Sequence, residues 1–431
     1  MNPLSSPYLL YGFRRLYTLA PHPLKVLVYR MVSAIQLRRL AVARKRFQIR
    51  WHASRHSGRT HKPQGINLIA DARSPMSGGV IARGVAVALG LAKIPFDIIN
   101  WGNRFAPKYE DTSFLHKEVR RSRYDISVVC ANPEGFVHLR LQLPLEILGD
   151  CYVVLYSFWE LPEFPENCLD VFGSINEYWA GSRFIQEAVA LRSPVPVVRI
   201  PPVVQLSSAR HFSREDLGLP ERRFLFLTMA DTLSVLERKN PLGVVKAFRK
   251  AFSGKDLSVG LVIKLNNPDH LTSSSWQSIL DEISNCENVY VLRRVLTGDQ
   301  VTSLISHSDC YVSLHRSEGF GLVPAEAMSL GKPTILTNWS GNTDYMTNDN
   351  SIGINYELVK VGKDYGPYKR DQYWAEPDIE QAAYWMRRIY QEPELARSLG
   401  LRGQETICSE YSAAAIGTLI SKRLEYIRRY V

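Results

Sequence analysis

The sequence predicts an α/β protein with two domains, each built around a parallel sheet. From residue 65 onward, short apolar runs alternate with segments of helical periodicity, a pattern typical of βαβ units. A chain of 431 residues has room for two domains of about 150 to 200 residues, each with its own core. The expected strands are 66–70, 96–100, 126–130, 151–156 and 195–200 in the first half, and 224–229, 257–265, 289–292, 310–314 and 334–337 in the second.

A cluster of prolines marks the boundary between the two halves. Pro194, Pro196, Pro201 and Pro202 are followed by a polar stretch over 205–216, which is typical of a linker. We therefore expect a first domain over 63–204 and a second over 205–400, with a helical region over 378–430. In sheets of this kind, ligands bind at the carboxyl ends of the strands, so the sequence predicts a site in a cleft between the domains.

Positive charge is concentrated at the start of the chain. The formal net charge is +11, but no Asp or Glu precedes Asp71, and residues 1–70 contain ten Arg and three Lys, a local charge of +13. The rest of the chain therefore has a net charge of −2, the difference between these values. This remaining part of the chain has no excess of basic residues and no known motif for nucleic-acid recognition, so the sequence does not indicate nucleic-acid binding.

Residues 1–62 are expected to form a basic N-terminal arm. Apolar residues recur at helical spacing over 24–47, and five basic residues lie within 38–46. A basic amphipathic helix is the usual form of a membrane-surface anchor, which predicts peripheral contact with the anionic inner face of a plasma membrane. A disordered tail, or an arm that packs on the body, accounts for the same residues equally well.

Cysteine usage indicates a reducing compartment. The six cysteines form no CxxC pair and no metal-ligand spacing, and several lie inside apolar runs, as small core residues do. No run of 18 uncharged apolar residues is present, so a membrane-spanning helix is not expected. These observations predict a cytoplasmic protein without a metal site.

Two carboxylates surround a glycine loop in the second half. Glu318 and Glu326 are eight residues apart, Gly319 and Gly321 lie between them, and the expected strand 310–314 precedes them. Pro324 suits the first turn of a helix, so the loop should present free backbone N–H groups at a helix N-terminus, a site for phosphate or diphosphate. Carboxylates beside a phosphate site suit a ligand with hydroxyls as well, such as a nucleotide sugar.

This stretch resembles the E-x7-E motif of retaining glycosyltransferases of family 4, which have two facing Rossmann-like domains of the GT-B type. The resemblance covers Glu318, Gly319, Phe320, Gly321, Leu322 and Glu326 and continues through 331–333. It implies that Glu318 binds hydroxyls of the donor sugar, that Glu326 binds the ribose and that the loop binds the diphosphate. An ordinary strand–loop–helix unit with a solvated Glu face is the plain structural alternative.

The resemblance extends to other segments of the second domain. It is strong over 224–400, moderate over 65–205 and absent over 1–60. Lys239 matches the family's diphosphate-binding lysine, and Arg238 beside it is assigned the same role; such cations stabilise charge on a leaving diphosphate. A solvated Arg–Lys pair before a proline-capped helix is the structural alternative. Ser340, Gly341 and Asn342 follow the expected strand 334–337 and could donate to the diphosphate or sugar, although a tight turn explains them equally well. The base-binding segment of the family falls near Arg293.

Two segments of the first domain are candidates as well. Gly78 and Gly79 form a glycine turn between the first strand and a helix, which favours close approach of a ligand; a turn that serves the backbone geometry alone is the structural alternative. Glu160 lies in a segment, 156–165, that resembles one bacterial branch of the family, and it is our candidate on the acceptor side of the cleft. The resemblance also implies that the last helix, over 401–431, crosses back to the first domain.

The implied reaction transfers a sugar, with retention of anomeric configuration, from a nucleotide-diphosphate sugar to a glycan or lipid-linked acceptor. The family generally needs no metal or cofactor, and the nucleotide sugar is a co-substrate. The expected context is bacterial surface-polysaccharide or lipopolysaccharide biosynthesis. A non-catalytic sugar-nucleotide-binding or scaffold protein, a phosphorylase and an epimerase remain alternatives on this fold.

Overall fold

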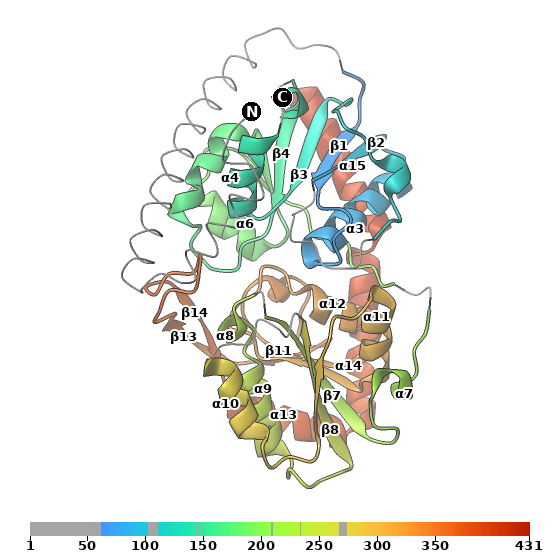
Figure 1. The fold of residues 1–431 in the computed structure, drawn as a ribbon, viewed down its shortest axis with the longest axis vertical. Helices are drawn as coiled ribbons and strands as arrows, with labels where there is room; N and C mark the ends of the chain where they lie inside the picture. Colours follow the sequence, from blue (N-terminus) through green and yellow to red (C-terminus); the bar gives the residue numbers. More distant parts are fainter. Residues whose placement is uncertain are drawn as a thin grey trace, which may run out of the picture.

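Two six-stranded parallel sheets organise the chain, which confirms the predicted two-domain α/β fold (Figure 1). The computed structural model describes residues 62–101, 111–143, 145–148, 150–207, 210–232, 234–266 and 274–431. The basic arm, with its expected helix over 24–47, lies outside the described residues. Among the described residues, no helix combines the length and the apolar character that crossing a membrane requires.

The first sheet has the order β2-β1-β3-β4-β5-β6. Its strands are β1 (Ile66–Ala70), β2 (Phe96–Asn100), β3 (Ile126–Cys130), β4 (Tyr152–Ser157), β5 (Glu177–Ala180) and β6 (Val197–Arg199). Its helices are α3 (Ser77–Leu91), α4 (Pro133–Gln142), α5 (Leu145–Leu148) and α6 (Arg183–Ala190), with 3-10 turns η2 (Leu115–Lys117) and η3 (Glu166–Ser174). The five expected strands all form, whereas the short strand β5 was not predicted. The proline cluster is part of β6 and its flanks, so the linker begins after this strand.

The second sheet has the order β12-β11-β10-β7-β8-β9. Its strands are β7 (Phe224–Asp231), β8 (Val259–Asn266), β9 (Val289–Arg293), β10 (Cys310–Ser313), β11 (Thr334–Thr337) and β12 (Ile352–Ile354). The helices along this half are α7 (Arg214–Leu217), α8 (Leu236–Lys239), α9 (Pro241–Ala251), α10 (Ser274–Ile283), α11 (Gly298–His307), α12 (Leu322–Ser329), α13 (Ile379–Gln391) and α14 (Pro393–Glu410). The expected strands form here too, and only the three-residue β12 is additional.

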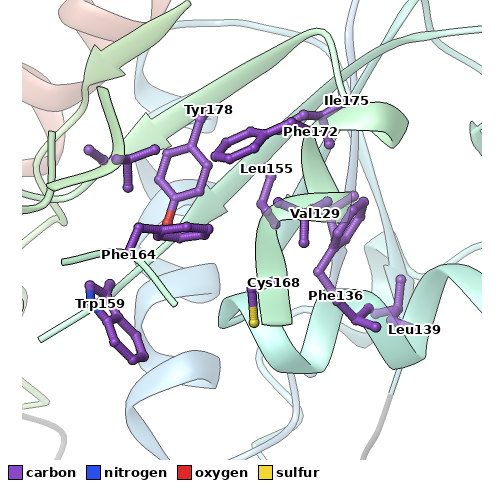
Figure 2. Close-up of a cluster of buried hydrophobic side chains, with 14 of the residues drawn as sticks. Val129, Phe136, Leu139, Leu155, Trp159, Phe164, Cys168, Phe172, Ile175 and Tyr178 are labelled. Carbon is purple, nitrogen blue, oxygen red and sulfur yellow. The ribbon is translucent and has the colours of Figure 1, made fainter. Parts of the chain in front are cut away.

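Aromatic and aliphatic side chains fill one face of the first sheet. Figure 2 shows Val129 and Leu155 from the sheet meeting Phe136 from α4 and the rings of Phe164 and Tyr178. These side chains are buried, because α4 and the segment around η3 cover this face. Burial of this kind contributes about 25 cal/mol for each Å² of apolar surface, so the strands of the first sheet, including β4 ahead of Glu160, are anchored on a packed core.

The last helix, α15 (Ala413–Tyr430), covers the other face of the first sheet (Figure 1). It contributes Ile416, Ile420, Leu424 and Ile427 to the core there. A Cβ at Gly417 would lie 2.6 Å from the backbone oxygen of Ala88 on α3, so glycine permits this close helix crossing. The chain returns to the first domain between α14 and α15, later than residue 401.

An antiparallel hairpin that the sequence analysis did not predict joins the two domains. Strands β13 (Tyr356–Lys360) and β14 (Tyr373–Pro377) follow the second sheet in the chain. Nevertheless, Val361, Tyr368 and Trp374 are buried in the core cluster of the first domain. The rings of Tyr368 and Trp159 lie 5.6 Å apart. The hairpin therefore belongs to the second domain by sequence and contacts the first domain by packing.

Candidate functional site

Three loops of the second domain meet at one edge of its sheet. β10 lies between β7 and β11, and all three strands run parallel. Because the carboxyl ends of parallel strands share one edge, the segments after β7, β10 and β11, which carry Lys239, Glu318 and Ser340, are brought together. The loop after β10 also contacts the first domain, where the chain leaves β4. The carboxyl edges of the two sheets therefore face each other.

Glu318 is the centre of this site. Its carboxylate pairs with the ammonium of Lys239, and its other oxygen lies 3.3 Å from Nη1 of Arg238. The Glu318 side chain is only 11% exposed. Burial by itself would raise the pKa of Glu318, but Lys239 and then Arg238 outweigh it and lower this pKa to about 2. Glu318 is therefore a carboxylate at neutral pH, able to accept hydrogen bonds from hydroxyls.

The two neighbouring cations differ in their surroundings. The Arg238 guanidinium is buried and donates to the backbone oxygen of Ser317 at 2.6 Å and to Oγ of Ser234 at 2.8 Å. The Lys239 side chain is 25% exposed. Lys239 can therefore contact a ligand, whereas Arg238 is engaged in holding the glutamate loop. Both residues lie on α8, which ends where Asn240 takes a left-handed conformation with a φ of 51°.

Backbone amides of the glycine loop are free to bind an anion. Within the described residues, the amides of Gly319, Phe320 and Gly321 donate to no other group. Gly321 adopts a φ of 83° at the N-cap of α12, which therefore starts without a side-chain cap. An uncapped helix N-terminus attracts negative charge. Leu322 is half-buried at the first helical position.

Phe320 has a structural place in this loop. Its side chain is buried, and its ring centroid lies 5.2 Å from that of Tyr345 and 5.6 Å from that of Tyr411. The Tyr345 hydroxyl donates to the backbone oxygen of Gly321 at 2.7 Å. The side chain of Phe320 thus anchors the loop on the core, so only its backbone is available to a ligand.

The loop after β11 is joined to the glutamate loop by backbone contacts. The amide of Gly341 donates to the backbone oxygen of Glu318 at 2.9 Å. A Cβ at Gly341 would lie 1.9 Å from the backbone oxygen of Gly319, so no other residue fits there without displacing the loop. Ser340 and Asn342 are buried and contact protein groups around Glu318. They hold the loop in shape.

Sequence reasoning missed His315, which connects the same two loops. Its Nε2 lies 2.9 Å from Oδ1 of Asn342 and 3.3 Å from the backbone oxygen of Trp339. Its Nδ1 lies 3.2 Å from Oγ of Ser313. Two acceptors at Nε2 place the proton there. Burial lowers the pKa of His315, so this ring is neutral. The sequence did contain one signal for this residue, because His315 directly follows the expected strand 310–314.

Glu326 lies on α12, one turn beyond the loop. The side chain is half-buried and has no hydrogen-bond or ion-pair partner among the described residues. Burial raises the pKa of Glu326 to about 8. A carboxyl group that is buried without a partner costs free energy, and it is available to hydroxyls of a ligand.

The first domain closes the site from the other side. Ser182 donates to the backbone oxygen of Gly319 at 2.5 Å, and the hydroxyl of Ser317 donates to the backbone oxygen of Glu160. Asp344 accepts from the amide of Arg183 at 2.9 Å. Glu160 is therefore placed directly beside the glutamate loop, as a half-buried side chain.

The remaining candidates, Gly78, Gly79 and Arg293, also lie at or after the carboxyl ends of strands, but none of them contacts Glu318 in the described part of the chain. Gly78 and Gly79 begin α3, after β1; a Cβ at Gly79 would lie 2.1 Å from the backbone oxygen of Ser74, whereas Gly78 is exposed. Arg293 is exposed at the end of β9, with its guanidinium 5.7 Å from the ring centroid of Trp276. β7 and β8 separate it from the glutamate loop.

The described residues contain no group of three or more His, Cys, Asp or Glu placed to hold a metal ion.

Comparison with known proteins agrees with this architecture. Residues 210–405 match the sequence model of the family described as Glycosyl transferases group 1. No curated protein sequence matches the chain significantly. Solved structures with the same fold include sucrose-phosphate synthase from Thermosynechococcus elongatus, with a TM-score of 0.62 and 16% identity over 85% of this chain and 100% of that one.

Two further structures share the fold. A glycosyltransferase from Rickettsia africae ESF-5 has a TM-score of 0.60 and 13% identity, and the match covers 86% of this chain and 100% of that one. HepE from Anabaena, solved in complex with UDP and glucose, has a TM-score of 0.56 and 13% identity over 84% of this chain and 100% of that one. At these identities the likeness shows the fold, which is the GT-B arrangement of two facing Rossmann-like domains.

Proposed function

We propose that this protein is a retaining glycosyltransferase that moves a sugar from a nucleotide-diphosphate sugar to a hydroxyl of an acceptor. The observation that carries the proposal is the position of Glu318. Its buried carboxylate is held between Lys239 and Arg238 beside three free backbone amides. A ligand that has both hydroxyls and a diphosphate satisfies all of these groups. The family match over residues 210–405 supports the same conclusion.

In this proposal Lys239 and the loop amides bind the diphosphate. The Lys239 ammonium is partly exposed, and a compact cation of this kind acts as a point charge on phosphate. The amides from Gly319 to Gly321 and the N-terminus of α12 add fixed partial positive charge. Charge that develops on the leaving nucleoside diphosphate is thereby stabilised, so no divalent metal ion is needed for this step.

The two glutamates bind the hydroxyls of the donor. Glu318 is ionised and accepts from hydroxyls of the sugar. Glu326, on the following helix, hydrogen-bonds to the hydroxyls of the ribose, and a ligand there supplies the partner that this half-buried carboxyl group does not have among the described residues. Arg238 acts through Glu318 as a positioning residue, because its guanidinium is already bound to Ser317 and Ser234.

The acceptor enters from the first domain, where Glu160 lies. Its hydroxyl attacks on the face from which the diphosphate leaves, and a phosphate oxygen takes its proton, so the anomeric configuration is retained. The bond from the anomeric carbon to the diphosphate breaks as the new glycosidic bond forms. We expect a glycan or lipid-linked acceptor in surface-polysaccharide or lipopolysaccharide assembly on the cytoplasmic side of the membrane.

A thermal-shift panel of UDP-, GDP-, dTDP- and ADP-sugars tests the proposal. A bound donor raises the melting temperature by mass action, and we expect one nucleotide class to do so. Release of the nucleoside diphosphate in the presence of EDTA then tests for metal-independent turnover, and NMR of the product gives its anomeric configuration. Binding without turnover would favour a non-catalytic protein. Free sugar phosphate or an epimerised donor would favour a phosphorylase or an epimerase.

A further inference from the structure

A tyrosine from the β13–β14 hairpin makes a contact across the domains beside the proposed site. Tyr368 lies on the hairpin loop, and its ring is buried in the first domain's core against Trp159. Its hydroxyl donates to Oε2 of Glu160 at 2.9 Å. Burial raises the pKa of Tyr368, so this hydroxyl stays protonated and remains a donor.

Glu160 is held at two points, and one carboxylate oxygen remains available. Its backbone oxygen accepts from the hydroxyl of Ser317, the residue before Glu318. Oε2 accepts from Tyr368, and Oε1 has no partner among the described residues. The side chain is half-buried. A carboxylate fixed through one oxygen presents the other in a defined direction.

The same tyrosine touches the donor side of the site. The Arg238 guanidinium lies 5.7 Å from the ring centroid of Tyr368, within the range of a cation–π contact. Arg238 in turn lies 3.3 Å from Glu318. Tyr368 thus packs between Arg238, which pairs with Glu318 on the donor side, and Glu160 of the first domain.

We propose that Tyr368 is a positioning residue for Glu160, and that the free oxygen of Glu160 orients the attacking hydroxyl of the acceptor. This inference rests on the proposed glycosyl transfer. The acceptor subsite is then composite, because the second domain supplies Tyr368 and the first supplies Glu160. A carboxylate at this point accepts from a neutral hydroxyl and repels phosphate or carboxylate groups. We therefore infer an acceptor whose reactive sugar carries no acidic group next to the attacked hydroxyl.

The test compares Tyr368→Phe with Tyr365→Phe. Both substitutions remove one hydroxyl from the same hairpin, and the hydroxyl of Tyr365 bonds to no described residue. The donor is the sugar nucleotide that stabilises the wild type most, and the acceptors are water and a set of neutral p-nitrophenyl glycosides. Turnover is measured as release of the nucleoside diphosphate, and binding of the nucleoside diphosphate is measured by calorimetry.

We expect Tyr368→Phe to lower kcat/KM for the acceptor by about tenfold or more, as loss of a hydrogen bond to a charged group does. Nucleoside-diphosphate affinity and the melting temperature should stay close to wild type. Tyr365→Phe should change none of the three quantities, kcat/KM included. Glu160→Gln should lower turnover similarly, and combining it with Tyr368→Phe should add little, because the two side chains act as one unit.

Other outcomes contradict the inference in recognisable ways. Unchanged turnover in Tyr368→Phe would overturn it while leaving the proposed function intact. Parallel losses of nucleotide affinity and melting temperature would assign Tyr368 to packing instead. Full additivity with Glu160→Gln would show that the residues act independently. A wild type that binds a donor but never releases the diphosphate also counts against the inference. A wild type that binds no sugar nucleotide would overturn the proposed function, and the inference with it.

Discussion

The hydroxyl of Ser340 accepts a hydrogen bond from the backbone amide of Glu318 at 2.8 Å. Ser340 adopts a φ of 74° and a ψ of −151°, a conformation that residues with a side chain rarely take and that costs of order 1 kcal/mol or more. The contact of Gly341 with Glu318 and the imidazole of His315 hold the two loops in this arrangement. The backbone of the glutamate loop is therefore preorganised before any ligand binds.

Glu318→Gln should abolish most activity and also reduce stability. The substitution removes the negative charge between Lys239 and the buried Arg238, and breaking a buried pair costs about 3 kcal/mol. Turnover should fall by tenfold to a hundredfold, as expected for a lost hydrogen bond to a charged group. Urea unfolding and nucleoside-diphosphate release measure the two effects.

Glu376→Gln is the matched control for that substitution. Glu376 pairs with Arg316 but is 41% exposed, so its loss should cost less than about 1 kcal/mol and leave turnover unchanged. Near wild-type turnover in Glu318→Gln would contradict the role of Glu318 in the proposed function.

Lys239→Ala should weaken binding of UDP more than binding of uridine, if UDP is the nucleotide class that binds. The lysine is expected to contact phosphate rather than base or ribose, because its ammonium is partly exposed and pairs with Glu318, the residue directly before the glycine loop. Lys246→Ala, an exposed lysine on α9, controls for loss of a positive charge in the same domain. Equal losses for both ligands in calorimetry would place Lys239 outside the diphosphate site.

Gly341→Ala should disrupt the site through the backbone alone. The new methyl group would meet the backbone oxygen of Gly319 at 1.9 Å, so the two loops must separate. Donor-dependent thermal stabilisation should be lost. Gly90→Ala, on α3 in open space, should instead be neutral or stabilise the protein by up to about 1 kcal/mol. If Gly341→Ala keeps wild-type donor binding, the contact between the loops is not needed for the site.

Glu326 should make stability depend on pH. Its pKa is raised from 4.5 to about 8 by burial, so between these values the folded state holds a proton that the unfolded state has released. The free energy of unfolding should therefore fall as the pH rises through this window, by at most about 1.4 kcal/mol per pH unit. Glu326→Gln should flatten this dependence, whereas Glu405→Gln, exposed on α14, should not. Urea unfolding at pH 5, 6.5 and 8 measures the slopes, and identical slopes in all three proteins would contradict the assignment.

The basic arm should bind anionic membranes. Residues 1–70 carry +13 without any acidic residue, and each basic residue near an anionic leaflet contributes about 1 kcal/mol. Full-length protein should co-sediment with vesicles that contain anionic lipid, less so as salt rises, and protein lacking residues 1–60 should remain in solution. If both forms stay in the supernatant, the anchor hypothesis fails. Aggregation of the truncated form would instead indicate that the arm packs on the body.

Local patterns in the sequence are enough to predict the two sheets and the loop that carries Glu318 and Glu326. Apolar runs bounded by glycine, proline and polar residues are local signals, and strands 66–70, 96–100, 126–130 and 334–337 follow them residue for residue. The spacing of the two glutamates around Gly319 and Gly321 is also local. That several loops share one sheet edge could also be predicted, because it follows from the order of strands and helices along the chain.

How these groups are combined into one site depends on contacts between distant segments of the folded chain. Arg238 and Lys239 are neighbours in sequence, yet Arg238 is buried against Ser317 and Lys239 is partly exposed. Tyr368 meets Glu160 across 208 positions of the chain, and no local pattern predicts such a contact. The same holds for the unusual pKa of Glu326, which arises from the surfaces packed around it. Burial and long-range pairing depend on the complete fold, because they are properties of the space between segments and not of any one segment.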